Sequence, residues 1–125
     1  MAFEIFNRRD SYGLGKWPHV VLSSMGYLIL NSAVMREYVG KKKYAIFLFD
    51  EADRKIGIRF IDKPNKDSYT LTFSSGHCAS ICARALCNTY KIEIGIGKRV
   101  RYTPTFDEKQ QILEIDLTQK EESHD

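Results

Sequence analysis

Short apolar runs, separated by glycines and polar turns, follow one another along most of this chain. Runs of this length that are rich in β-branched and aromatic residues are typical of strands. Two stretches instead have helical composition, and Asn31-Ser32 supplies an N-cap for the first, which Gly40 ends. The pattern predicts an α+β, mostly β chain with helices over 33–39 and 83–89 and strands over 20–22, 27–30, 44–49, 55–61, 69–73, 78–82, 100–106 and 112–117.

One pattern occurs twice. A small-residue turn at Ser23–Gly26 precedes an extended run, a helical run and a hairpin that begins Phe49-Asp50-Glu51. The same order returns after Ser74-Ser75-Gly76 and ends in a hairpin that begins Phe106-Asp107-Glu108. A unit of half this size cannot bury its own apolar face. We therefore expect two ββαββ repeats that pack as a pseudo-twofold barrel, with the helix ends together on one side.

The 125 residues fit one domain of ordinary size. Residues 1–18 are expected to form an N-terminal arm, and residues 19–117 the barrel domain. Within it, repeat one spans 19–61 and repeat two spans 69–117. The apolar stretch at 90–97 either extends the sheet or forms a longer loop, and the acidic tail 118–125 is expected to be frayed.

Composition narrows the class of protein. Hydrophobic residues at 43% and charged residues at 28% exclude wholesale disorder. Neither a membrane-spanning run nor the apolar core of a signal peptide is present, so we expect a soluble, cytoplasmic protein without a membrane role. Cys78, Cys82 and Cys87 crowd into one segment, which indicates reduced thiols that act as small buried hydrophobes.

The run Ser24-Met25-Gly26-Tyr27-Leu28-Ile29-Leu30-Asn31 is followed by Val34–Gly40, then by 47–51 and 56–59. This order of sequence segments resembles that of the AbrB/SpoVT family of swapped-hairpin transcription factors. The resemblance covers residues 20–61 well and 69–117 more loosely. The resemblance implies an AbrB-like or double-psi β-barrel, both halves of which come from this one chain, and DNA binding through arginines on one rim. The chain departs from the family pattern at Tyr27 and Asn31, where family members have a basic residue and a proline.

The net charge of +3 is only mildly basic, but the basic residues are clustered. Such clusters bind phosphates, although solvated surface lysines and arginines produce the same pattern. Tyr12, Trp17, Tyr27 and Tyr102 lie among these charges and would suit stacking on unpaired bases, although aromatic residues on strands more often pack in the core or across strands. The candidate nucleic-acid-binding residues are Arg8, Arg9, Lys16, Arg36, Lys41, Lys42, Lys43, Arg84, Lys98, Arg99 and Arg101.

Nothing in the sequence favours catalysis, a metal or a cofactor. His77 and the three cysteines lack the second ligand cluster that structural zinc uses, and on a strand His77 would face away from Cys78. The acidic residues of the two hairpins sit in turns, where they are solvated. An enzyme would require a deep pocket that joins His77 to a thiol.

The favoured function is therefore non-catalytic nucleic-acid binding, most simply by a small DNA-binding transcriptional regulator. A homodimer is compatible with this function. The alternative is a protein-interaction module, such as an adaptor or inhibitor of phage, plasmid or defence-system origin, that docks a partner through the barrel rim or a strand edge.

Overall fold

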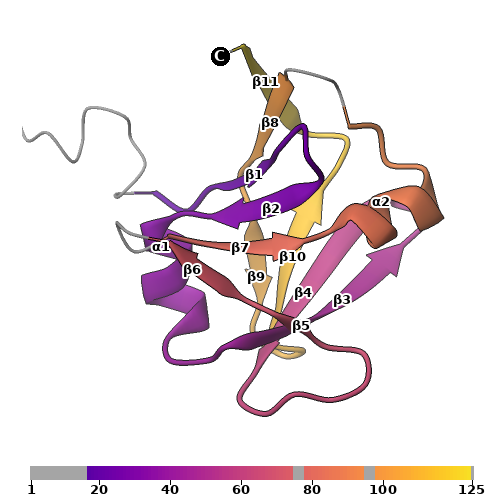
Figure 1. Cartoon of the computed structure of the whole chain (residues 1–125). Helices are drawn as coiled ribbons and strands as arrows, with labels where there is room; N and C mark the ends of the chain where they lie inside the picture. The colour runs from indigo at the N-terminus through magenta and orange to yellow at the C-terminus, as the bar shows by residue number, and fades with distance from the viewer. Residues whose placement is uncertain (1–16, 75–77, 95–97, 125) are drawn as a thin grey trace, which may run out of the picture.

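The computed structural model describes residues 17–74, 78–94 and 98–124, which form two antiparallel sheets and two short helical segments (Figure 1). The predicted α+β, mostly β class is confirmed. One sheet has six strands, in the order β11 (Lys120–His124), β8 (Lys98–Tyr102), β1 (Val20–Leu22), β2 (Tyr27–Leu30), β7 (Cys78–Cys82) and β6 (Thr72–Ser74). The other has five, in the order β5 (Tyr69–Thr70), β3 (Tyr44–Asp50), β4 (Lys55–Ile61), β10 (Ile112–Asp116) and β9 (Thr105–Asp107).

The two predicted hairpins form, and their turns share one local structure. Asp50 pairs with Lys55 in the first hairpin and Asp107 with Ile112 in the second. In each turn the first aspartate accepts a backbone N–H three residues later, and the last turn residue has a positive φ, 53° at Arg54 and 57° at Gln111. The repeated Phe-Asp-Glu sequence therefore forms the same turn twice.

The two halves of the chain meet strand to strand in the middle of each sheet. In the five-stranded sheet Ile58 of β4 pairs with Leu113 of β10, and Ile56 pairs with Ile115. Phe49 pairs with Ile56 in one hairpin, as Phe106 pairs with Leu113 in the other, so Ile56 and Leu113 are equivalent positions. Each half thus pairs with the counterpart position of the other, as a twofold relation requires.

The six-stranded sheet repeats this arrangement between β2 and β7. Leu30 and Cys82 each stand immediately before the N-cap of a helix. Tyr27 pairs with Cys82 and Leu30 pairs with Ala79, so the start of each strand meets the end of the other. The halves are consequently joined by backbone hydrogen bonds in both sheets and do not fold as separate domains.

At two places the chain passes directly from one sheet to the other. Only Leu71 separates β5 from β6, and only Thr103-Pro104 separate β8 from β9. A single strand over 100–106 was the expectation, and it is wrong because Pro104 has no N–H to contribute to a ladder. Among the described strands, no pairing closes the two sheets into one barrel.

The core lies between the sheets and is almost wholly aliphatic. The strand residues that point inward are fully buried, and the helical segment α1 (Ser32–Val34), its continuation η2 (Met35–Val39) and α2 (Arg84–Tyr90) each add buried side chains. The largest fully buried side chains are Leu22, Leu28, Leu30, Ile56, Ile58, Ile81, Leu113, Ile115, Val20, Val34, Val39 and Cys87.

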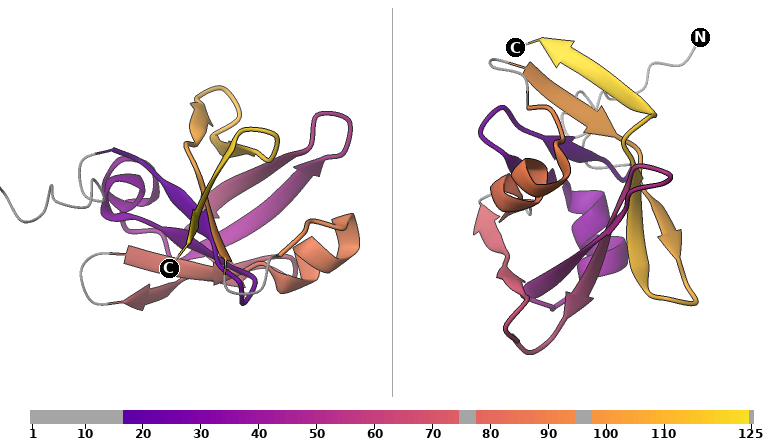
Figure 2. Two further views of the ribbon diagram at one scale, coloured as in Figure 1. Left: turned by 90° about the horizontal axis from the view of Figure 1, so that it is seen from above. Right: turned by 90° about the vertical axis from the view of Figure 1, so that its right-hand side faces the viewer.

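The helices stand apart. Figure 1 places α1 and η2 on one side of the molecule and α2 on the other, and the view from above in Figure 2 keeps that separation. The expectation that the helix ends lie together on one side is therefore wrong. Each helix is reached directly from its own β-strand, β2 or β7, and these two strands run antiparallel, so their ends point in opposite directions.

The C-terminal tail differs from expectation as well. Residues 120–124 form β11, which pairs with β8 along its whole length, so the expected fraying over 118–125 is wrong for this part. Thr118 begins the turn into it, with both its backbone N–H and its hydroxyl donating to Asp116. Of the 90–97 stretch, which was expected to extend the sheet or form a longer loop, the structure describes residues 90–94. Within that part, residues 91–94 form no strand.

Asn31 is the buried polar residue that ties the start of the chain to the first helix. Its Oδ1 accepts the backbone N–H of Val34, as an N-cap does, and also that of His19, both at 3.1 Å. Its Nδ2 donates to the carbonyl of Trp17 at 2.7 Å. The predicted capping role is confirmed, with two more bonds than a cap requires.

Replacing Asn31 with alanine should remove all three bonds and leave buried backbone N–H groups unsatisfied. We expect a loss of about 2 to 4 kcal/mol in the free energy of unfolding, measured by urea titration. Asn88→Ala, on the exposed side of α2, is the matched control and should change stability by less than about 0.5 kcal/mol. Equal losses in both variants would contradict the role given to Asn31.

Gly57 lies in β4 opposite Glu114 of β10, where the halves meet. A Cβ there would sit 2.9 Å from Cγ2 of Ile112 and 3.3 Å from Cβ of Leu48. Gly57→Ala should therefore cost about 1 to 3 kcal/mol by overpacking. Ile112→Leu removes the clashing methyl, so the double variant should be more stable than the sum of the single losses predicts, by at least about 0.5 kcal/mol. Strict additivity in urea titrations would count against this clash.

Candidate nucleic-acid interface

The alternation of side chains along β8 sets two arginines on the outer face of the six-stranded sheet. Val100 and Tyr102 are buried in the core, at 9% and 4% exposure, so Arg99 and Arg101 between them point outward. Arg101 lies opposite Val21 of β1 and, on the other side, opposite Glu121 of β11. These two arginines lie on the second strand from the edge of the sheet, where the backbone ladders with β11 and β1 fix their spacing.

Tyr27 and Arg84 add an aromatic ring and a third arginine to this face. Tyr27 begins β2 and is 37% exposed, on the same face as Val21 and Ile29. The Arg84 guanidinium lies 6.0 Å from the centre of the Tyr27 ring and donates to the carbonyl of Met25, with Nη2 at 3.1 Å. The arrangement holds the first residue of α2 against the turn between β1 and β2.

Gly26 makes this close approach possible. Its φ is +84°, and a Cβ there would lie 3.3 Å from Cβ of Arg84. Its carbonyl accepts the N–H of Ala83, the N-cap of α2, at 2.8 Å. The turn glycine identified in the sequence therefore contacts the start of the second helix and accepts a hydrogen bond from its N-cap residue.

We call Tyr27, Arg84, Arg99 and Arg101 the arginine face. By strand pairing, β1 alone separates β8 from β2, so Arg101 and Ile29 flank Val21 at about 10 Å from each other, two strand spacings. This spacing is well within the reach of arginine side chains. The face therefore presents two guanidinium groups and one ring on the sheet, with a third guanidinium from α2 over that ring.

The structure leaves the other predicted basic residues elsewhere. Arg36 on η2 and Lys41 and Lys43 in the following turn are exposed, while Lys42 is half-buried, and all four lie on the side of the molecule away from α2 (Figure 1). Lys98 begins β8. Arg8, Arg9 and Lys16, and Tyr12 with them, lie outside the described residues.

The aromatic candidates divide in the same way. Tyr102 is 4% exposed because it alternates with Arg101 and faces inward, so of the two alternatives it packs in the core and is not placed to stack on bases. Trp17 is 62% exposed, beside Asn31 at the start of the described chain. Met25, at 64% exposure in the turn next to Arg84, is an apolar contact residue that the sequence pattern did not single out. Its place in a tight turn before a glycine was the available signal.

The thiols are only partly as expected. Cys87 is buried, but Cys78 and Cys82 are half-buried on the outer face of the six-stranded sheet. Burial raises the pKa of the Cys87 thiol above its ordinary value, and nearby Cys82 raises it further. Within the described residues, no three His, Cys, Asp or Glu side chains gather closely enough to hold a metal ion.

Comparisons with known proteins give no match: neither a protein-family model, nor a curated protein, nor a solved structure is similar to this chain. No helix of the described part of the chain is long and apolar enough to cross a membrane.

The thiols should react at different rates, because the thiolate is the nucleophile and burial withholds it at Cys87. With iodoacetamide at pH 8, peptide mapping by mass spectrometry should find Cys78 and Cys82 alkylated well before Cys87. In urea the three should react alike. Modification of native Cys87 as fast as the other two would contradict its burial.

Proposed function

We propose that this protein is a non-catalytic nucleic-acid-binding protein and that the arginine face is its contact surface. The observation that carries the proposal is the placement of Arg99 and Arg101 on the same outer sheet face as the exposed Tyr27 ring, over which α2 holds Arg84. Guanidinium groups bind phosphate oxygens through paired N–H donors, and they remain charged at every physiological pH. Phosphate contacts of this kind supply most of the affinity for nucleic acids.

Duplex DNA is the ligand that the AbrB/SpoVT resemblance implies, in the role of a transcriptional regulator. The finer fold belongs to this proposal: a barrel in which the corners at Leu71 and Pro104 bring the sheet edges together, built from two repeats with twofold registers. The contact surface we propose differs from the one first expected, since a sheet face replaces paired helix ends. Its arginines come mainly from β8, which lies between α2 and the hairpin of β9 and β10.

A specific observation also favours the alternative, a protein-interaction module. The edge strand β6 (Thr72–Ser74) is exposed along its whole length, and Phe73 is 52% exposed. Edge strands with exposed aromatic residues accept an extended partner segment by β-augmentation. In the sheet order β1, β2 and β7 lie between this strand and β8. Substitutions can therefore test the two surfaces separately.

Arg99→Gln/Arg101→Gln tests the nucleic-acid proposal without inverting charge. By fluorescence anisotropy with a labelled duplex, we expect Kd to rise at least about tenfold, because two phosphate contacts are lost. The slope of log Kd against log salt should fall by about 2 for the same reason. Tyr27→Ala should weaken a labelled single strand of the same sequence by about tenfold or more if bases stack on that ring.

Lys41→Gln/Lys43→Gln removes the same charge from the other side of the molecule and is the matched control. It should change Kd by less than about threefold, since exposed charges beyond a Debye length are screened. Equal weakening by the two double variants, or no binding of either probe at low salt, would overturn the proposal. Loss of a partner-binding signal on Phe73→Ala alone would then favour the interaction module.

A further inference from the structure

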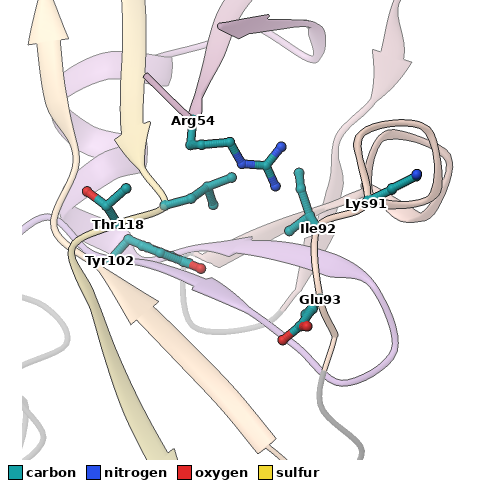
Figure 3. A pocket seen from close by; sticks show the side chains of 7 residues that line it. Arg54, Lys91, Ile92, Glu93, Tyr102 and Thr118 are labelled. Carbon is teal, nitrogen blue, oxygen red and sulfur yellow. The ribbon is translucent and has the colours of Figure 1, made fainter. Parts of the chain in front are cut away.

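A cavity of about 290 Å³ lies between the end of α2, the β3–β4 turn and the turn after β10. That volume is near the lower limit of about 300 Å³ for pockets that bind small organic ligands. Figure 3 shows the lining side chains from these three segments and from β8. The residues that line it are Arg54, Lys91, Ile92, Glu93, Tyr102, Leu117 and Thr118.

Arg54 is the cation of this cavity, and the fold holds it in place. Its backbone takes a positive φ of 53°, and its carbonyl accepts the N–H of Leu117 at 3.0 Å. Its Nη1 donates to the carbonyl of Tyr90, the last residue of α2, at 3.0 Å. The guanidinium also lies 5.2 Å from the centre of the Phe49 ring, which stacks on Tyr90.

The Arg54 guanidinium, although held in place, keeps N–H donors with which it can bind an anion. A guanidinium has five N–H donors, and among the described residues the hydrogen bonds of Arg54 use one of them. The side chain is half-buried, so a bound anion would meet it partly out of water, where the attraction is stronger. Figure 3 shows the guanidinium directed into the cavity and the Lys91 ammonium directed away from it.

Three apolar side chains share the rest of the wall with polar ones, and the lining surface is more polar than apolar. Ile92 is 8% exposed, the Tyr102 ring is 4% exposed, and Leu117 is half-buried. Thr118 already donates its hydroxyl and its N–H to Asp116, which lowers the pKa of that carboxyl and keeps it ionised. Glu93 is the carboxylate of the lining itself, whereas Asp116 lies behind Thr118. These two negative groups disfavour ligands that carry a double negative charge.

We propose that this cavity binds a small organic monoanion, with a carboxylate on the Arg54 guanidinium and the rest of the molecule beside Ile92, Leu117 and the ring of Tyr102. The site is independent of the arginine face: Tyr102 faces inward from β8, whereas Arg99 and Arg101 face outward. Its test needs no nucleic acid, so its failure and that of the proposed function are distinguishable.

Benzoate is the probe, and benzamide is its neutral counterpart of the same shape. In titrations of ¹⁵N-labelled protein followed by NMR, benzoate should shift the signals of Arg54, Ile92 and Leu117. Benzamide should bind at least about tenfold more weakly, since it cannot make the charge-assisted bonds. Phenyl phosphate, a dianion, should bind more weakly than benzoate and gain about fivefold in Glu93→Gln, where one repulsion is removed.

Arg54→Gln should weaken benzoate at least about tenfold. Because it also loses the contacts with Tyr90 and Phe49, Lys91→Glu tests the site without touching the core. It adds a negative charge at the rim and should weaken benzoate by about threefold, while Lys63→Glu, the same change in an exposed loop, should leave the affinity unchanged. The proposal is overturned if benzoate shifts no cavity signals, if benzamide binds equally well, or if the two lysine variants behave alike.

Discussion

The antiparallel pairing of β4 with β10 is the interaction on which the rest of the molecule depends. It joins the two halves at Gly57 and Glu114, and it is closest there because β4 has no side chain at the point where Ile112 and Leu48 approach. The pairing of β2 with β7 repeats the solution in the other sheet. With both in place, the inward residues of each half complete one aliphatic core, and neither half is left with an exposed apolar face.

The same pairing decides where the polar chemistry can lie. Since β2 and β7 run in opposite directions, the helices that follow them leave the sheet at opposite ends, and Arg36 and Arg84 are separated. What remains together is set by the sheet itself: β8 carries Arg99 and Arg101 outward, and Gly26 allows α2 to bring Arg84 over Tyr27. On the inner side of that strand, Tyr102 borders the cavity of Arg54. One strand thus contributes to two surfaces of different chemistry.

Local features of the fold were readable from the sequence, and long-range ones were not. The Asn31 cap, the turns after Phe49-Asp50 and Phe106-Asp107, and most strand positions followed from residue type and spacing. The split at Pro104 was missed although proline forbids a ladder bond there, because the apolar run continues across it. The strand β11 was missed because its sequence is polar and the strand is stabilised by pairing with β8. For the site, the sequence named the three arginines, but only the sheet register separates them from Arg36 and turns Tyr102 inward.

Trp17, the single tryptophan of the chain, has a consequence for how this protein can be observed. Its carbonyl is anchored by Asn31, yet 62% of the residue meets solvent in the folded state. Its emission in the native protein should already resemble that of an indole in water. Denaturation will therefore shift the emission maximum only slightly. The buried tyrosine Tyr102 and the stacked Phe49–Tyr90 pair make near-ultraviolet circular dichroism the more informative spectroscopic signal of the intact core.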